Sequence, residues 1–341
     1  MDASASDFIL FRKVGMFMTE KQFKKGDVIF REGDRGESLF QIVDGVVGVY
    51  ASYGEAGEQL LTELSADQFL GEMAVIEAYP RSATAVALAD VKAVEIQSGE
   101  VSEYFKSQPD KVMDIMKHLG GRLRELTDDY SDVCATIEEL HLGEEKPERS
   151  KSLIERIKKF ASVYKSSRNA DRLSAETIRK LDRTGHADGF TTNVEGYSKG
   201  TILFREGEKG DCMYDVHSGS VGIYKAYGLP DEKLLTTLQP NQFFGELGMV
   251  ENSKRSGTAV VMSDNTSIEV IYEKDLNELF RENPVKIEMI LAHLSHRLRR
   301  LTKEYMTACK LVYRVSDAEA NGTVSEELKK EAENYQAFFY D

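Results

Sequence analysis

Glycine, glutamate and arginine recur in this sequence at a spacing that suits a phosphorylated ligand. Gly71-Glu72 is followed by Arg81, and the same spacing recurs with Gly245-Glu246 and Arg255. The arginine guanidinium is a planar, charged fork that matches phosphate oxygens. Glycine lets the backbone approach a ligand closely, and the start of a helix offers free N–H groups to an anion. A carboxylate cannot hold a phosphate but accepts hydrogen bonds from a ribose hydroxyl. The two sets therefore predict two sites for a ligand with a phosphate and hydroxyl groups.

Both sets lie in a long internal repeat. The segment 25–33 recurs as 199–207, and the register continues without a gap through the two glycine-glutamate pairs. After one inserted residue, Arg122-Leu123-Arg124 matches Arg297-Leu298-Arg299. A repeat of this length indicates a duplicated domain rather than a solenoid of short units.

Each copy begins with short strands and ends with a long helix. Segments 28–30, 39–43 and 46–50 contain β-branched and aromatic residues, with glycines in the turns between them. After Gln108-Pro109 and Asn283-Pro284, the apolar period changes from that of strands to that of a helix. We predict an α+β fold, mainly β, with two tandem jelly-roll-like β-rolls. Each roll is followed by a phosphate-cassette helix and a long C-terminal closing helix.

The closing helices carry regular apolar seams. Leu119 and Leu123 belong to the first seam, and Leu294 and Leu298 occupy the matching positions of the second. An apolar seam of this kind needs a partner surface. Each seam could pack on its own β-roll. We expect instead that the two helices pair, either as an internal pseudo-dimer or in a homodimer of two chains.

The two copies of the repeat, and the stretch of chain between them, define the expected domain boundaries. Within the linker, one helix is expected over 150–165 and a second from Ser174. The predicted units are the first domain with its closing helix at 1–142, a helical linker at 143–190, the second domain with its closing helix at 191–315, and a polar C-terminal tail at 316–341.

Net charge and cysteine usage limit the function classes. The 341 residues include 44 Lys and Arg against 58 Asp and Glu, which gives a formal net charge of −14 at pH 7. A chain this acidic repels phosphate backbones, so nucleic acid is not expected as a partner. The 3 cysteines form no paired motif, which is typical of reduced thiols. The apolar run 8–11 is too short for a signal or membrane segment. We therefore expect a cytoplasmic protein with no membrane partner.

The segments around both arginines resemble the cyclic nucleotide-binding domain family. This family includes protein kinase A regulatory subunits, cyclic-nucleotide-gated channels and the bacterial catabolite activator protein. The resemblance rests on Phe69–Ala74 with Pro80–Ala85, and on Phe243–Gly248 with Lys254–Ala259. It implies that the glutamate binds the ribose 2′-OH and that the arginine binds the cyclic phosphate. The predicted ligand contacts are Gly71, Glu72, Met73, Ala74, Arg81, Ser82, Ala83 and Tyr130 in the first copy, and Gly245, Glu246, Leu247, Gly248, Arg255, Ser256, Gly257 and Tyr305 in the second.

The choice of base rests on fewer residues. In the catabolite activator the closing helix contacts the purine, and aligning that helix here brings Tyr130 and Tyr305 near the contact position. A tyrosine can stack on a base and donate a hydrogen bond, although both rings fit the helix seam equally well. Serine after arginine, at Ser82 and Ser256, resembles the bacterial cyclic AMP sensors. We predict cyclic AMP rather than cyclic GMP as the ligand, and no metal.

The predicted function is a regulator that is not an enzyme. Ligand binding would reposition the closing helices, and an unknown effector protein would respond. The sequence has no set of nucleophile and base and no Walker loop, and of its histidines only His217 lies in a strand region. A kinase regulatory subunit would carry an inhibitor segment, which 1–17 lacks.

Two alternatives belong to other classes. The first is a DNA-binding regulator of the catabolite-activator type, although 316–341 contains no basic recognition helix. The second is a ligand-free tandem β-roll scaffold that binds protein directly.

Overall fold

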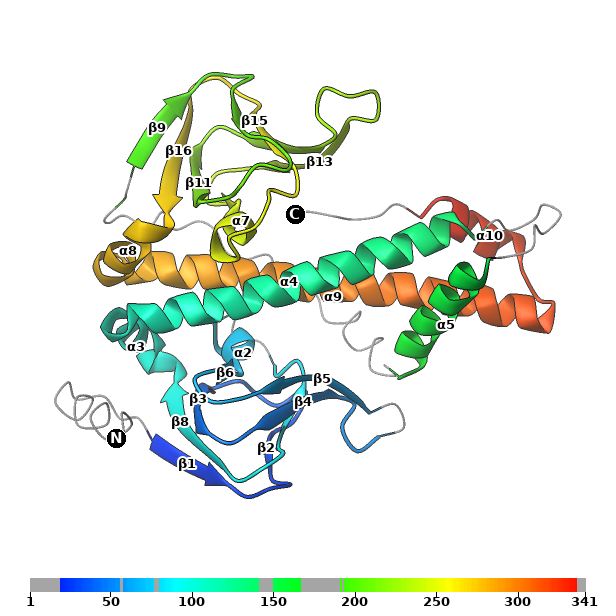
Figure 1. Ribbon diagram of the computed structural model, residues 1–341, viewed down its shortest axis with the longest axis horizontal. Coiled ribbons are helices and arrows are strands. Elements are labelled where there is room, and N and C mark those ends of the chain that lie inside the picture. The colour runs from blue at the N-terminus through cyan, green and yellow to red at the C-terminus, as the bar shows by residue number, and fades with distance from the viewer. Residues whose placement is uncertain are drawn as a thin grey trace.

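Two β-rolls lie on opposite sides of a pair of long helices (Figure 1). The α+β class and the two tandem β-rolls predicted from the sequence are confirmed. The computed structural model describes residues 19–55, 58–76, 80–140, 150–166, 191 and 193–335. None of the helices in these ranges has the length and hydrophobicity that a bilayer crossing requires.

Each roll consists of two antiparallel four-stranded sheets. The strands of the first repeat are β1 (Thr19–Phe23), β2 (Val28–Phe30), β3 (Ser38–Asp44), β4 (Val47–Ala51), β5 (Gln59–Leu64), β6 (Phe69–Leu70), β7 (Thr84–Ala87) and β8 (Val91–Gln97). Those of the second are β9 (Asn193–Tyr197), β10 (Ile202–Phe204), β11 (Cys212–Ser218), β12 (Val221–Lys225), β13 (Lys233–Leu238), β14 (Phe243–Phe244), β15 (Thr258–Val261) and β16 (Thr266–Tyr272). The strand orders β1-β8-β3-β6 and β2-β7-β4-β5 recur as β9-β16-β11-β14 and β10-β15-β12-β13.

Glycine is required at one matched turn of each roll. Gly45, between β3 and β4, has φ 95°, and Gly219, between β11 and β12, has φ 82°. A Cβ atom on Gly45 would lie 2.3 Å from the carbonyl oxygen of Asp90, and one on Gly219 would lie 2.2 Å from Oγ1 of Thr266. Left-handed backbone and close approach therefore both exclude a larger residue.

The helices repeat in the same order as the strands. The first repeat has α2 (Glu72–Ile76), α3 (Val101–Ser107) and α4 (Pro109–Glu138), the second has α7 (Glu246–Val250), α8 (Leu276–Glu282) and α9 (Pro284–Asn321), and two further helices are α5 (Lys151–Ser166) and α10 (Glu326–Glu333). The first linker helix was expected where α5 lies, and Ser150 Oγ caps it by accepting from the Leu153 N–H at 3.1 Å. The second expected linker helix lies outside the described residues. Helix α9 continues past the expected domain boundary at 315.

The closing helices α4 and α9 pack against each other and run in the same direction (Figure 1). Leu119 and Leu123 of α4 share one buried core with Leu294 and Leu298 of α9. Further along, a second core is formed where α5 and α10 join the pair. The pairing predicted from the two seams is therefore present within one chain, as an internal pseudo-dimer.

We expect Leu119→Ala and Leu294→Ala each to lower the free energy of unfolding by about 2–5 kcal/mol, because each removes a fully buried side chain from the shared core. Urea unfolding measures the loss. The control is Leu229→Ala, whose side chain is 59% exposed and which should stay within about 0.5 kcal/mol of wild type. Equal losses in all three variants would contradict the shared core.

Candidate functional site

Each predicted site begins at a glycine that adopts left-handed backbone just before a short helix. Gly71 precedes α2 with φ 80°, and Gly245 caps α7 with φ 76°. We call 71–76 with 81–83 the first cassette, and 245–250 with 255–257 the second. A Cβ atom on Gly71 would lie 2.2 Å from Nη1 of Arg81, and one on Gly245 would lie 2.7 Å from Nη1 of Arg255. Each glycine therefore makes room for the arginine of its cassette.

Both cassette arginines are buried and held in the same way. Arg81 is 5% exposed, and its Nη1 and Nη2 donate to the carbonyl oxygens of Gly71 (2.9 Å) and Ser38 (2.6 Å). Its guanidinium lies 4.2 Å from the centre of the Phe30 ring. This arrangement fixes the plane of the fork, because backbone and an aromatic face hold it from different directions.

The second arginine repeats these contacts with matched residues. Nη1 and Nη2 of Arg255 donate to the carbonyl oxygens of Gly245 (2.5 Å) and Cys212 (2.8 Å), and Phe204 lies 4.3 Å from the guanidinium. The stacking phenylalanines, Phe30 and Phe204, were not predicted. They occupy matched positions in the repeat, and that was the available signal.

The arginines also show that the cassettes suit an anion. Nε of Arg81 and Nε of Arg255 are both buried and have no hydrogen-bond partner among the described residues. Burial lowers the pKa of Arg81, although Glu72 is the first of the charges that oppose this shift. A phosphate oxygen would supply both the missing acceptor and the missing negative charge.

The cassette glutamates are buried beside basic side chains of the closing helices. Glu72 is 4% exposed and Glu246 is 1% exposed. Glu246 forms an ion pair with Arg297 of α9. Burial lowers the pKa of the matched Arg122 of α4, and Glu72 is the main charge that opposes this effect. Arg122 and Arg297 were recognised as repeat matches but not as partners of the glutamates.

In the second repeat these groups surround a cavity of about 250 Å³. It is lined by 245–248 and 255–257 of the second cassette, by His293, Arg297, Arg300 and Leu301 of α9, and by Leu123, Arg124, Thr127 and Asp128 of α4. Helix α4 belongs to the first repeat. The second site is therefore completed by a helix from the other repeat, which sequence matching alone did not predict.

The contact residues predicted in the second repeat, apart from Tyr305, line this cavity. Gly245, Glu246, Leu247, Gly248, Arg255, Ser256 and Gly257 all line it. Their counterparts at the matched positions of the first repeat are Gly71, Glu72, Met73, Ala74, Arg81, Ser82 and Ala83. Glu72 also lines a separate cavity of about 300 Å³ with His118 of α4, and Arg81 is not part of that lining.

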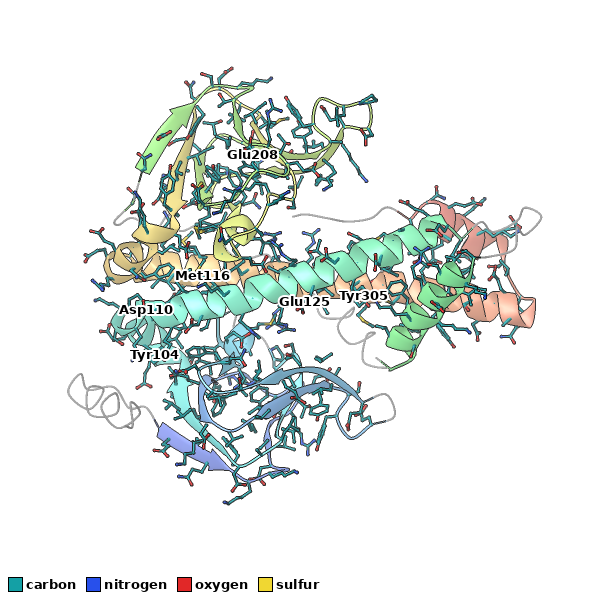
Figure 2. The ribbon with its side chains drawn as sticks, in the orientation of Figure 1. Tyr104, Asp110, Met116, Glu125, Glu208 and Tyr305 are labelled. Atoms are coloured by element: carbon teal, nitrogen blue, oxygen red, sulfur yellow. The ribbon has the colours of Figure 1, made fainter. Side chains whose placement is uncertain are left out.

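Tyr130 and Tyr305 are not brought to the cassettes. Both are buried in the core that α4 and α9 share with α5 and α10, and Figure 2 shows Tyr305 on α9 near α5, away from both rolls. The hydroxyl groups of Tyr130 and Tyr335 lie 3.2 Å apart, and Tyr305 meets the Phe160 ring edge-on. The prediction that these two tyrosines contact the base is therefore corrected, because both pack in the core between the helices. The cavity instead reaches Thr127 and Asp128, about one helical turn earlier than Tyr130.

Each closing helix also touches the cassette region of the other repeat. Arg124 of α4 forms an ion pair with Glu251, directly after α7, and a hydrogen bond to Oγ of Ser253. The matched Arg299 of α9 donates to the carbonyl oxygen of Met73 in α2 at 3.0 Å. The two cassettes are therefore joined through the paired helices.

Comparison with known proteins agrees with this geometry. A family model described as "Cyclic nucleotide-binding domain" matches residues 20–108 and 194–283, together just over half of the chain. The chain belongs to the cyclic nucleotide-binding domain family. It contains two such domains in tandem, and the resemblance noted from the cassettes is confirmed.

Three relatives illustrate the range of the family. The cyclic AMP receptor protein of Thermus thermophilus is 31% identical over 32% of this chain and 50% of its own length. The cAMP-dependent protein kinase regulatory subunit of Dictyostelium discoideum is 22% identical over 75% of this chain and 64% of its own length. This chain thus spans less than two thirds of either relative. The solved regulatory domain of Toxoplasma gondii PKA with cAMP is 17% identical, with a TM-score of 0.25, over 82% of this chain and 85% of that one.

We expect Gly71→Ala to destabilise the protein more than Gly54→Ala. Both glycines have positive φ, near 80°, so both variants gain backbone strain of roughly 1 kcal/mol. Only at Gly71 does the new methyl group displace Arg81 and leave buried carbonyl groups without donors, which costs roughly a further 1–3 kcal/mol. Chemical unfolding of both variants measures the difference. Equal destabilisation would show that the glycine does not support the arginine.

Proposed function

We propose that this protein is a cyclic nucleotide sensor that binds one ligand in each cassette, prefers cyclic AMP to cyclic GMP, and acts on an effector protein without catalysis of its own. The observation that carries the proposal is the matched setting of Arg81 and Arg255. Each is buried, fixed by two backbone carbonyls and left with an Nε atom that has no partner in the part of the chain that the structure describes. Burial of such a group in both repeats costs free energy unless an anion supplies the missing hydrogen-bond acceptor.

The lining of the second cavity supports one orientation of the ligand. The cyclic phosphate would lie between Arg255 and the first N–H groups of α7, which suits its negative charge. The ribose 2′-OH would donate to the carboxylate of Glu246, which Arg297 holds in place. The base would then extend toward the closing helices, where α4 lines the cavity.

The base end of the second site contains an acidic group from the other repeat. Thr127 and Asp128 line the cavity from α4. An ionised carboxylate only accepts hydrogen bonds. Adenine has a donor amine at C6 where guanine has an acceptor oxygen, so a carboxylate that faces this edge favours adenine. The position of α9 that matches Asp128 is Lys303, so the two closing helices differ in charge at this position. The preference for cyclic AMP also rests on Ser82 and Ser256, as in the bacterial sensors that the cassettes resemble.

The contacts between repeats support a relay through the closing helices. A ligand that moves α7 acts on α4 through Glu251 and Arg124, and one that moves α2 acts on α9 through Met73 and Arg299. A ligand shifts such an equilibrium only by its difference in affinity for the two arrangements. The reduced cysteines favour a cytoplasmic location for this activity.

The first test is calorimetric titration of the nucleotide-stripped protein with cyclic AMP and then with cyclic GMP. We expect two cyclic AMP per chain and weaker binding of cyclic GMP. No heat at several temperatures, together with no thermal stabilisation, would instead support a ligand-free scaffold.

Arg81→Ala and Arg255→Ala should each weaken binding at their own site by about 2–5 kcal/mol, because the phosphate loses its buried countercharge. The matched controls are Arg31→Ala and Arg205→Ala, which remove exposed arginines of the same two rolls. These controls should leave both affinities unchanged. If the cassette variants also retain both affinities, the cassettes are not the binding sites.

Asp128→Asn should reduce the ratio of cyclic AMP to cyclic GMP affinity at the second site about tenfold, because a neutral amide replaces a charged acceptor. Titrations in the Arg81→Ala background isolate this site. The control is Asp132→Asn, which changes an exposed carboxylate further along α4. An unchanged ratio would remove Asp128 from the base contact.

A further inference from the structure

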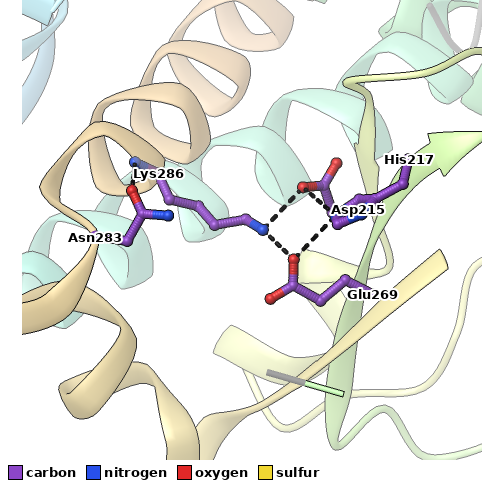
Figure 3. Close-up of polar contacts among 5 residues, drawn as sticks. All are labelled: Asp215, His217, Glu269, Asn283 and Lys286. Atoms are coloured by element: carbon purple, nitrogen blue, oxygen red, sulfur yellow. Dashed lines mark hydrogen bonds and ion pairs between the residues drawn. The ribbon is translucent and has the colours of Figure 1, made fainter. Parts of the chain in front are cut away.

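A buried group of charges joins the start of α9 to the roll of the second repeat (Figure 3). Asp215 of β11 and Glu269 of β16 are directly opposite each other in the antiparallel ladder, and they are 5% and 0% exposed. Two like charges facing each other in a buried sheet are strongly unfavourable unless a cation lies between them.

Lys286 supplies that cation. It lies in the first turn of α9 and is 1% exposed, and its Nζ lies 3.0 Å from Oδ2 of Asp215 and also forms an ion pair with Glu269. Asn283 caps the same turn, since its Oδ1 accepts from the Lys286 N–H at 3.2 Å. The first turn of α9 is therefore attached to two strands of the roll as well as being capped.

His217 of β11 lies at the rim of this group. Its Nε2 is 3.1 Å from Oε2 of Glu269 and 3.6 Å from Oδ2 of Asp215. Hydrogen bonds to Asp215 and then to Glu269 raise the pKa of His217 to about 9, although burial and Lys286 act against the shift. When His217 is protonated, the two negative charges of the carboxylates equal the two positive charges of Lys286 and His217.

At the matched positions, all of which the structure describes, the first repeat has no equivalent of this group. In the register of its sheet, Gln41 pairs with Val94 where Asp215 pairs with Glu269, and Val43 stands where the second repeat has His217. The matched lysine, Lys111 of α4, instead pairs with Asp67, whose side chain is 79% exposed. An exposed pair of this kind holds a helix weakly.

The position of the group connects it to the cassette. Strand β11 carries both Asp215 and Cys212, and the carbonyl oxygen of Cys212 accepts from Arg255. Helix α9 carries both Lys286 and Arg297, the partner of Glu246. The first part of α9 is therefore connected to the second repeat at two points. Lys286 connects it to the roll, and Arg297 connects it to the cassette.

We propose that Asp215, Glu269 and Lys286, with His217 at the rim, form a charge latch that fixes the start of α9 to the second roll, so that ligand-driven movement is carried by α4. The assignment of the ligand-driven movement rests on the proposed function. The latch itself does not, because its contacts involve no ligand.

Amide hydrogen exchange on the full chain tests the latch. In the unliganded triple variant D215N/E269Q/K286M, which keeps the side-chain shapes and removes the charges together, exchange over the first turns of α9 should rise about tenfold or more. Lys111→Met, the matched control, should leave α9 unchanged. If the triple variant protects α9 as well as wild type does, the latch is overturned.

The same measurement with cyclic AMP tests the direction of movement. In wild type, the nucleotide should change exchange at the start of α4 and leave the start of α9 unchanged, whereas in the triple variant both starts should respond. A wild-type response confined to α9 would overturn the assignment of movement. Calorimetric failure to bind would refute the proposed function, and the unliganded comparison would still decide the latch.

The pH dependence of melting provides a second readout for the latch. A raised His217 pKa gives stability that is complete below pH 6.5 and is lost as pH rises through about 9. The melting temperature of wild type should therefore fall over this interval more steeply than that of His217→Gln. Parallel curves would remove His217 from the latch.

Titration with Zn²⁺ separates the latch from a metal site, because Asp215, His217 and Glu269 could also ligate a metal ion. The latch predicts no stoichiometric binding that depends on Asp215, since Lys286 already occupies the position of the cation. One Zn²⁺ bound per chain and lost in Asp215→Asn would overturn it.

Discussion

The packing of α4 against α9 is the constraint on which the rest of this structure depends. Each roll buries an apolar core of its own, but the core that contains Leu119 and Leu294 exists only when the two helices meet. Because α4 lies over the second cassette, this packing also supplies part of the wall of the second cavity. The helix pair therefore does more than join the domains, since it completes the wall of the second cavity and places Arg124 and Arg299 against the opposite cassette regions.

Burial of charge is the second theme. Arg81 and Arg255 are buried in both repeats, and each donates to two backbone carbonyls while its Nε has no partner among the described residues. Buried polar groups normally find partners, so an Nε atom without one among the described residues, at the same position of both repeats, fits a site for an anion. The glutamates of the cassettes differ from the arginines, because Glu246 already has a partner of opposite charge in Arg297. This division fits a ligand that brings its own negative charge to one side and neutral hydroxyl groups to the other.

The two repeats have kept the cassettes and diverged elsewhere. Both preserve the glycine, glutamate, arginine and stacking phenylalanine. They differ along the closing helices, where Asp128 of α4 matches Lys303 of α9, and at the start of these helices. Asp215 and Glu269 replace Gln41 and Val94 in the second repeat, so the matched lysines Lys286 and Lys111 have quite different partners. The two cassettes therefore share their glycine, glutamate, arginine and phenylalanine but lie in different surroundings.

The sequence by itself determined the duplication, the two β-rolls, the cassette residues and the existence of helix seams, because these depend on local turn chemistry and on periodicity along the chain. It also indicated that the seams pair. Only the tertiary structure decided that α4 completes the second site and that Tyr130 and Tyr305 belong to the helix core rather than to the ligand. It also decided that Lys286 meets two opposed carboxylates. These features join residues far apart in the chain, and no local pattern records which face of a helix meets which repeat.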